Sequence, residues 1–335
     1  MPDVRFVPIA FACLVLASSG LGAGHARAQT TSGAAAISYP EKPVRVIIAF
    51  APGGGVDILA RAVSLKLGET LGRPFIVENR PGAGGTTAYA FAAKAAPDGY
   101  NLLAVSGAYA MSAALYRNLP YDAVRDFAPI AQMGAAPFLI VVHPSLPVKN
   151  VKDLVALAKA RPGELNFASG GIGSSGHLTG ELFKYVAGIN MTYIPYKGGD
   201  LALVDLISGQ VHVVVSNLLS SLPHVRSGRL RAIAVTSLQR HSALPDVPTV
   251  DASGLAGFEA VNWYGWLAPA ATPLAIVQKL NAEIGSVVRQ PEVQQQFARD
   301  GAEPAWSTPA QFGERIVREV ARWRKIVAAA GLQVQ

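Results

Sequence analysis

The chain of 335 residues contains a single cysteine, Cys13, which lies in an apolar stretch close to the N-terminus. One cysteine excludes a disulfide within the chain and a metal site built from several thiolates. Removal of the N-terminal segment on export would remove this thiol as well, leaving no cysteine nucleophile. We therefore expect a protein held together by its hydrophobic core alone.

Beyond the N-terminus the chain also lacks a hydrophobic run long enough to span a membrane, although 50% of its residues are hydrophobic. Residues 1–5 form a short n-region with the basic Arg5, weakened by Asp3, residues 6–21 are mostly apolar, and residues 26–28 form an Ala-x-Ala cleavage pattern. This predicts a signal peptide over residues 1–28, cleaved near Ala28, and a periplasmic protein. A membrane anchor is the alternative, but the apolar run is shorter than the roughly 20 residues of a span. A lipid anchor at Cys13 is a weaker alternative, because Phe11 stands where a small or branched residue is needed.

Clusters of charge are absent. The formal net charge is +7 and falls to +6 on processing, because Arg5 and Arg27 leave together with Asp3. The basic residues are scattered singly, without Lys/Arg runs and without interleaved aromatic residues. This pattern argues against a nucleic-acid partner and indicates a mildly basic surface that helps to attract anions.

Catalytic and metal-binding motifs are lacking too. No serine lies in a G-x-S-x-G motif, and no H-E-x-x-H or paired-histidine spacing indicates zinc. His177 follows Ser174 and Ser175 closely, which leaves a Ser–His hydrolase as an alternative, but no acidic partner is evident. We expect no catalytic residue, no metal and no cofactor, and therefore a protein that is not an enzyme.

Alternating strands and helices make up most of the chain. Residues 44–50, 75–77 and 102–106 are apolar runs typical of buried parallel strands, with helical patterns between them. A second series of strands is expected at 138–142, 165–168, 191–194, 211–215 and 230–235, followed by an extended stretch at 258–267 and helices from residue 273 onward. This order predicts an α/β fold with mostly parallel sheets flanked by helices, arranged as two lobes.

The first glycine-rich loop lies between the first strand and the helix that follows it. This loop contains Gly53, Gly54 and Gly55, so no side chain blocks the approach of a ligand to it. Its backbone N–H groups lie at a helix start, which suits a carboxylate or a phosphate. No Gly-Lys-Ser/Thr follows, so the loop is not a Walker A motif. Val56 and Asp57 complete this predicted clamp. The alternative is a tight turn in which Asp57 stabilises the helix.

The second glycine-rich loop spans residues 169–177. Gly171, Gly173 and Gly176 form a G-x-G-x-x-G pattern, but the next strand ends without the acidic residue that would bind a ribose. A second anion clamp therefore fits better than a dinucleotide site. Ser174 and Ser175 are also plausible helix N-caps, which is the purely structural alternative.

Together these segments resemble the tripartite tricarboxylate transporter receptor family, also called Bug receptors, from Tyr39 to about Ala329. The resemblance depends on the order and separation of several short motifs: YPEKP at 39–43, PGGGVD at 52–57 with Ala60-Arg61, ENRPGAGG at 78–85, PDGY at 97–100, LPYD at 119–122, the loop at 169–177 and PYKG at 195–198.

The resemblance implies a type II periplasmic-binding fold, in which crossing hinge strands near Pro137 and Val261 join the two lobes. Lobe 1 would comprise residues 37–137 and 258–335, and lobe 2 residues 138–257. It also implies that ligand carboxylates are held mainly by backbone N–H groups and water. The predicted ligand-binding residues are Gly53, Gly54, Gly55, Val56, Asp57, Ser106, Tyr109, Ser169, Gly171, Gly173, Ser174, Ser175, His177, Tyr196, Lys197 and Asn217. For Ser106 and Tyr109 a helix cap and a packed tyrosine are equally good interpretations.

One residue departs from the family pattern. Family members often carry an acidic residue immediately before the asparagine that corresponds to Asn217, and this chain has Ser216 there. If this position faces the ligand, the lost negative charge disfavours an ammonium group. We therefore expect a di- or tricarboxylate or an aromatic acid, delivered to membrane transporter subunits. The alternatives are a ligand sensor for a membrane signalling protein and an enzyme acting on a small acid.

Overall fold

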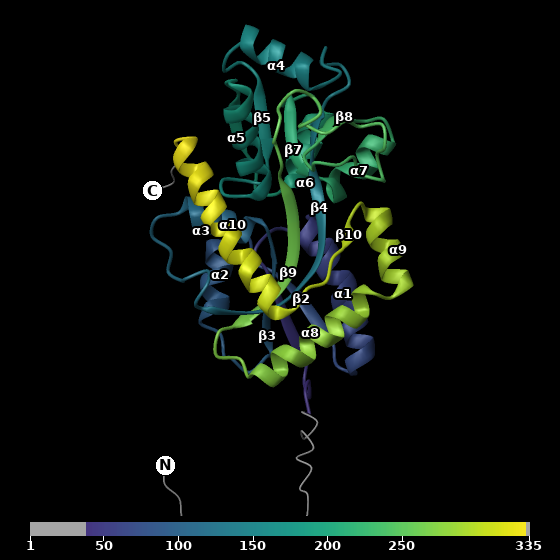
Figure 1. Ribbon diagram of the computed structural model, residues 1–335. Coiled ribbons are helices and arrows are strands. Elements are labelled where there is room, and N and C mark those ends of the chain that lie inside the picture. Colours follow the sequence, from purple (N-terminus) through teal and green to yellow (C-terminus); the bar gives the residue numbers. More distant parts are fainter. Residues whose placement is uncertain (1–37, 333–335) are drawn as a thin grey trace, which may run out of the picture. The chain divides into compact units, whose positions relative to one another are not determined.

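The computed structural model describes residues 38–332, so the predicted signal peptide lies outside the described residues. Its first sheet has the strand order β2-β1-β3-β9-β4, with a short β10 on β4 (Figure 1). Strands β1, β2 and β3 pair in parallel, whereas β9 runs antiparallel to β3 and β4. The bounds are β1 Val44–Ile48, β2 Phe75–Asn79, β3 Asn101–Ser106, β4 Phe127–Val142, β9 Val261–Pro269 and β10 Glu303–Pro304.

Both faces of the first sheet are covered, as the alternating side chains of β1 show. Val46 and Ile48 enter one core with the helices α1 and α8, while Ile47 points into the opposite core. The second of these cores contains residues of α2, α3 and α10. The helices around this sheet are α1 Gly55–Leu71, α2 Thr86–Ala93, α3 Ala108–Leu115, α8 Leu274–Val288, α9 Pro291–Asp300 and α10 Pro309–Ala329, with a 3₁₀ turn at Ala83–Gly85.

The second sheet begins on the same long strand, β4. Its order is β4-β7-β5-β6, with β8 paired to the other side of β4. Phe138 and Ile140 face a core with α4 and α5, while Leu139 and Val141 face a core with α6 and α7. The bounds are β5 Asn166–Ser169, β6 Thr192–Pro195, β7 Val213–Asn217, β8 Arg231–Val235, α4 Val151–Ala160, α5 Ser175–Ala187, α6 Gly199–Ile207 and α7 Leu218–Arg226.

One threonine side chain contacts both chain segments that cross between the two sheets. Along β4, pairing with β9 ends at Pro137 and pairing with β7 begins at Phe138. The backbone N–H of Phe138 donates to the Thr236 hydroxyl at 2.8 Å, and this hydroxyl lies 2.6 Å from the carbonyl oxygen of Ala260. The predicted hinge segments therefore meet at the buried Thr236. The lobe boundaries given above stay predictions.

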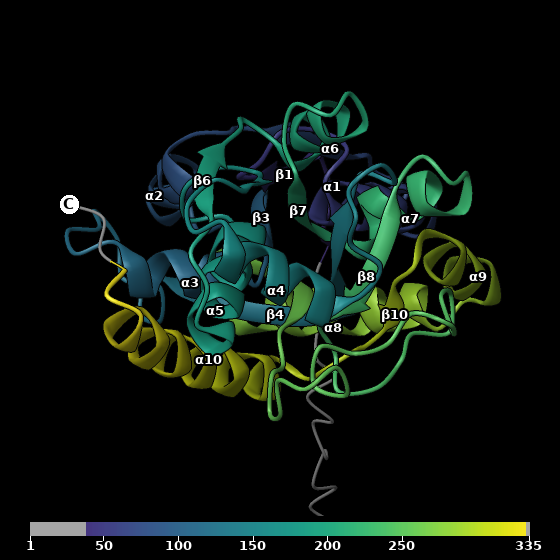
Figure 2. The same cartoon turned by 90° about the horizontal axis from the view of Figure 1, so that it is seen from above.

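The fold class expected from the sequence is confirmed: two lobes, each an α/β sheet flanked by helices, joined by crossing strands. The longer elements that were not expected are α3 and the first half of β4. Helix α10 lies beside α3 (Figures 1 and 2) and contacts both lobes, because Phe312 and Ile316 pack in a first-lobe core while Trp323 packs in a second-lobe core. Between residues 38 and 332 no helix combines the length and apolarity needed to cross a membrane.

Candidate functional site

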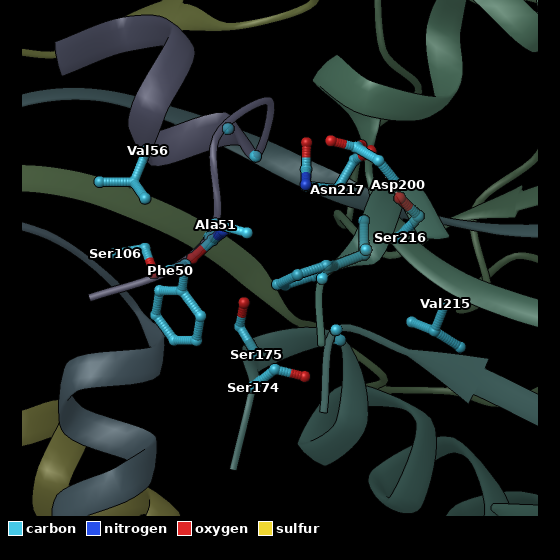
Figure 3. Close-up of a pocket in the computed structure, with 18 of the residues that line it drawn as sticks. Phe50, Ala51, Val56, Ser106, Ser174, Ser175, Asp200, Val215, Ser216 and Asn217 are labelled. Atoms are coloured by element: carbon cyan, nitrogen blue, oxygen red, sulfur yellow. Dashed lines mark hydrogen bonds between the residues drawn. The ribbon is translucent and has the colours of Figure 1, made fainter. Parts of the chain in front are cut away.

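A cavity of about 80 Å³ lies where loops of the two lobes face each other (Figure 3). The carboxyl ends of β1, β3 and β7 and the starts of α1, α5 and α6 surround it, which is the expected ligand position in α/β sheets. Its lining residues are Phe50, Ala51, Pro52, Gly54, Gly55, Val56, Ser106, Phe138, Gly170, Ser174, Ser175, Gly176, Gly198, Gly199, Asp200, Val215, Ser216, Asn217, Asn262 and Tyr264.

Helix α1 presents unpaired backbone donors to this cavity. Gly54 is its N-cap residue and makes no side-chain cap, and the N–H groups of Gly54, Gly55 and Val56 have no hydrogen-bond acceptor in the part of the chain described. The first N–H groups of any helix lack intrahelical partners and lie at the positive end of its dipole. Gly53 adopts a φ of 88°, a left-handed conformation that glycine tolerates best. The loop therefore exposes backbone N–H groups, without intervening side chains, to the cavity.

Two further helix starts face the same cavity. At α5 the hydroxyl of Ser174 caps the N–H of His177 at 3.2 Å, and Ser175 and Gly176 line the cavity. At α6 the N-cap Gly198 has no side-chain cap and lines the cavity with Gly199. Figure 3 shows Ser174 and Ser175 on one side of the cavity, with Asp200 and Asn217 on the other.

The lining of this cavity carries almost no charge. No Lys or Arg side chain lines the cavity, and Asp200 is the one charged residue among the lining residues of the described chain. The positive groups of the lining are therefore the N–H groups and dipoles of the converging helix starts. In the same part of the chain, residues 38–332, no group of three His, Cys, Asp or Glu side chains could hold a metal ion.

A buried tyrosine hydroxyl adds a donor from the crossing strand β9. The side-chain oxygen of Asn262 accepts the Gly107 N–H at 2.9 Å, so its amide nitrogen faces Tyr264 and donates to the phenol oxygen at 3.0 Å. The phenol oxygen is thus an acceptor toward Asn262, and its own proton is available for a ligand. Burial raises the pKa of Tyr264, with a smaller opposing effect of the Asn262 hydrogen bond, so the hydroxyl stays protonated.

Asp57 lies beside the first loop rather than in the cavity lining. Its carboxylate accepts hydrogen bonds from the Gly53 N–H at 3.1 Å, from Asn79 at 2.9 Å and from Arg61 at 3.0 Å. Burial raises the pKa of Asp57, but the hydrogen bonds from Arg61, Asn79 and Gly53 outweigh that effect, and the pKa lies below its usual value. The structure thus places this predicted ligand residue in a network that holds the loop in shape.

Several other residues predicted to bind the ligand instead make contacts within and beneath the second glycine-rich loop, outside the cavity. The hydroxyl of Ser169 lies 3.2 Å from that of Ser174 and 2.9 Å from that of Tyr193, and the His177 ring packs against Tyr193. The Gly173 N–H donates to Nδ1 of His177 at 3.3 Å. None of Ser169, Gly173 and His177 lines the cavity.

Tyr109 lies in a core rather than in the cleft. Its side chain is completely buried and donates to the carbonyl oxygen of Ala123 at 2.7 Å. Helix α3 begins directly after Gly107, which turns Tyr109 toward Tyr89 and Phe127 and away from the cavity. Ser106, at the end of β3, does line the cavity.

A second, larger cavity of about 790 Å³ adjoins the first and shares Phe50, Ala51 and Gly170 with it. Three more of the predicted residues, Gly171, Tyr196 and Lys197, line this outer cavity instead of the inner one. Its remaining lining residues come from both lobes and are mostly apolar or glycine: Pro81, Gly82, Ala83, Gly84, Gly85, Tyr116, Ile172, Pro195 and Leu201.

The inner cavity also contains residues that the sequence analysis did not single out as ligand-binding, above all Asp200, Asn262 and Tyr264. Asn262 and Tyr264 lie on β9, far along the chain from both glycine loops, so no local motif indicates them. Asp200 follows the PYKG motif by two residues, and its place near a helix start is equally typical of an acid that only stabilises the helix. Ser216, noted only as a departure from the family, does line the cavity.

Two lobes closing on a cavity formed by helix starts define a solute-binding protein. Residues 59–332 match the family model described as "Tripartite tricarboxylate transporter family receptor", and the chain belongs to this family. A curated relative, BugT of Bordetella pertussis, is 38% identical over 300 residues, covering 89% of this chain and 92% of that protein.

Solved structures agree with this assignment. A protein of R. palustris solved with adipate superposes with a TM-score of 0.85 at 35% identity, covering 88% of this chain and 99% of that one. The periplasmic binding protein BugD has a TM-score of 0.85 at 34% identity, covering 89% of this chain and all of that one. MatC from Rhodopseudomonas palustris, with bound malate, has a TM-score of 0.82 at 31% identity, covering 86% and 100%.

Proposed function

We propose that this protein is a periplasmic receptor that captures a small carboxylate between its lobes and delivers it to a membrane transporter, without chemical conversion. The observation that supports this most strongly is the convergence of the α1, α5 and α6 starts on a cavity lined by no cationic side chain. Such N–H groups bind anions well and need no Lys or Arg. The solved relatives with adipate and malate bind ligands of this class.

The two cavities together favour a di- or tricarboxylate or an aromatic acid as the ligand. One carboxylate would lie against the helix starts in the inner cavity. The body of the ligand would extend past Phe50 toward the outer cavity, where apolar residues and Lys197 are available. Lys197 would then face a second, outward carboxylate.

Export and closure complete the proposal. The signal-peptide pattern over residues 1–28 would direct the chain to the periplasm, and cleavage near Ala28 would release it. Ligand binding would favour the closed arrangement through its higher affinity for that form, with β4 and the segment before β9 bending near Thr236. The closed surface would then dock on transporter subunits, or on a signalling protein if the receptor serves as a sensor.

The test is a thermal-shift screen of the processed protein after unfolding, removal of carried-over ligand and refolding. The panel holds mono-, di- and tricarboxylic, aromatic and amino acids. We expect one chemical class to raise the Tm by several degrees, since binding to the folded form alone adds about 2.7 kcal/mol at a ligand concentration 100 times Kd. A flat response across the panel would contradict carboxylate capture, and turnover of a bound acid would indicate an enzyme instead.

A further inference from the structure

Asp200 occupies an unexpected position in a site built for anions. It lies in the first turn of α6, is half-buried, and is the one charged side chain among the described residues that line the inner cavity. Its carboxylate packs against Gly53 of the other lobe so closely that a methyl group at Gly53 would overlap Oδ2. The carboxylate therefore lies beside the α1 start, where the ligand's own carboxylate is expected.

This carboxylate has few partners. Within residues 38–332 it makes no ion pair with Lys or Arg, and the Ser220 hydroxyl is the side-chain group near enough to interact with it. Ser220 has one proton, and its hydroxyl donates that proton to the Gly53 carbonyl oxygen at 3.2 Å. Most of the hydrogen-bonding capacity of this half-buried carboxylate is thus unused within the described chain.

A role in stabilising α6 alone does not explain this geometry. Asp153 has that role in α4, where its carboxylate turns back and accepts the Lys149 N–H at 2.9 Å. Asp200 makes no such bond to its own helix start and lines the cavity instead. Burial raises the pKa of Asp200, with Asp57 adding to the effect and Ser220 and His224 opposing it. The charged form of Asp200 is therefore disfavoured in the cavity as it stands, and a donor on a ligand would stabilise it.

We propose that Asp200 is a specificity-determining residue that accepts a hydrogen bond from a hydroxyl or ammonium group of the ligand. The site then selects carboxylic acids that also carry such a donor over donor-free acids of the same skeleton. This inference rests on the proposed function as a carboxylate receptor. It replaces the expectation of an amine-free ligand, which depended on Ser216 alone, because the negative charge missing at Ser216 is present at Asp200 in the same cavity.

The effect of the ligand's hydrogen-bond donor can be measured with two sets of three acids. Succinate, malate and aspartate share one skeleton and carry hydrogen, hydroxyl or ammonium at one carbon. Phenylacetate, mandelate and phenylglycine do the same on an aromatic skeleton. Titration calorimetry would use the set whose skeleton raises the Tm of the processed protein. We expect the hydroxyl or the ammonium member to bind about tenfold or more tightly than the donor-free acid, as befits a charge-assisted hydrogen bond. Which of the two is preferred identifies the donor.

The decisive variant is Asp200→Asn, which keeps the size of the side chain and removes its charge. We expect the preference for the donor-bearing acid to fall at least about fivefold, and the donor-free acid to bind at least as tightly as before because repulsion is lost. Asp200→Ala should give the same change in preference. Asp246→Asn removes the same charge from an exposed position and should leave the preference unchanged.

Each outcome has a definite meaning. Equal affinity of the wild-type protein for all three members of a set, or an unchanged preference in both Asp200 variants, would overturn the inference while leaving carboxylate capture intact. Failure of every acid to bind the wild-type protein would overturn the proposed function itself. Unfolding midpoints measured without ligand would show that the variants are folded, so that the loss of preference reports on the site.

Discussion

The hydroxyl of Ser220 donates a hydrogen bond to the carbonyl oxygen of Gly53 at 3.2 Å. Ser220 belongs to α7 of the second lobe, and Gly53 lies in the loop before α1 of the first. The bond therefore joins the two lobes at the edge of the inner cavity. A separation of the lobes, as the proposed function requires for ligand entry, would break it.

Removal of this bond should weaken ligand binding. In Ser220→Ala the closed form loses one inter-lobe hydrogen bond, worth about 0.5–1.5 kcal/mol, so we expect the Kd for the bound acid to rise about 2- to 10-fold. Titration calorimetry measures this change. Ser208→Ala is the matched control, because the Ser208 hydroxyl at the end of α6 donates to the Val204 carbonyl oxygen of the same lobe, 3.0 Å away. Equal Kd values for both variants would contradict a closing role for Ser220.

Tyr264 should donate directly to the ligand carboxylate. Tyr264→Phe keeps the ring and removes the hydroxyl, so we expect the Kd to rise about tenfold or more, the usual effect of losing a hydrogen bond to a charged group. The Asn262 amide loses its acceptor as well, which should lower the free energy of unfolding slightly. Tyr121→Phe removes another buried hydroxyl, one without a hydrogen-bond partner in the described structure, and should leave the Kd unchanged. An unaltered Kd in Tyr264→Phe would exclude this contact.

The close approach at Gly55 should tolerate no side chain. A methyl group there would lie 2.5 Å from the Tyr264 hydroxyl oxygen and 3.2 Å from Oδ1 of Asn217. Gly55→Ala should therefore displace Tyr264, weaken acid binding and lower the free energy of unfolding by about 1–3 kcal/mol. Denaturant titration measures the stability. Gly199→Ala places its methyl in open space at another helix start and should change the stability by less than about 0.5 kcal/mol.

Protonation of His177 should couple stability to pH. Burial, with a smaller contribution from the Lys184 charge, lowers the pKa of His177 to about 4, against 6.5 for the ordinary side chain. The unfolded chain therefore binds the proton first, and the free energy of unfolding should fall as the pH drops from 6.5 to about 4. The full effect is at most about 3 kcal/mol.

The variant His177→Asn isolates this contribution, because it keeps an acceptor for the Gly173 N–H and cannot titrate. Denaturant unfolding between pH 7 and 4 should show that the stability advantage of the wild-type protein shrinks across this window. Parallel stability curves for the two proteins would show that His177 is not buried in its neutral form.

Most elements could be predicted because their periodicity is local. The apolar run at β1 and the bounds of α4, α8 and α10 follow from hydrophobic spacing and from Pro and Gly punctuation. The first half of β4 could not be predicted, because its sequence contains Pro129, Gly134 and Pro137. Its pairing also depends on β9, more than a hundred residues away. Helix α3 is rich in alanine and is buried on most sides, which leaves no amphipathic pattern.

The residues of the candidate site also fall into those that local sequence indicates and those that it does not. Both glycine loops can be recognised from their local sequence, and in the structure Gly54, Gly55 and Ser174 line one cavity. The partners that complete the cavity come from tertiary contacts, as Tyr264 does. Tyr109 shows that position along the chain can also mislead. Its place after β3 suggested that it lines the cleft, but the start of α3 turns its ring into the core.

The central claim is that backbone N–H groups at converging helix starts hold the carboxylate. Backbone amide NMR during titration with the acid found in the screen tests it most directly. We predict that the largest shifts, saturating with the calorimetric Kd, occur at the amides of Gly54, Gly55, Val56, Ser175 and Gly176. Saturable binding that leaves these amides unshifted, and moves those around Lys197 instead, would contradict the account.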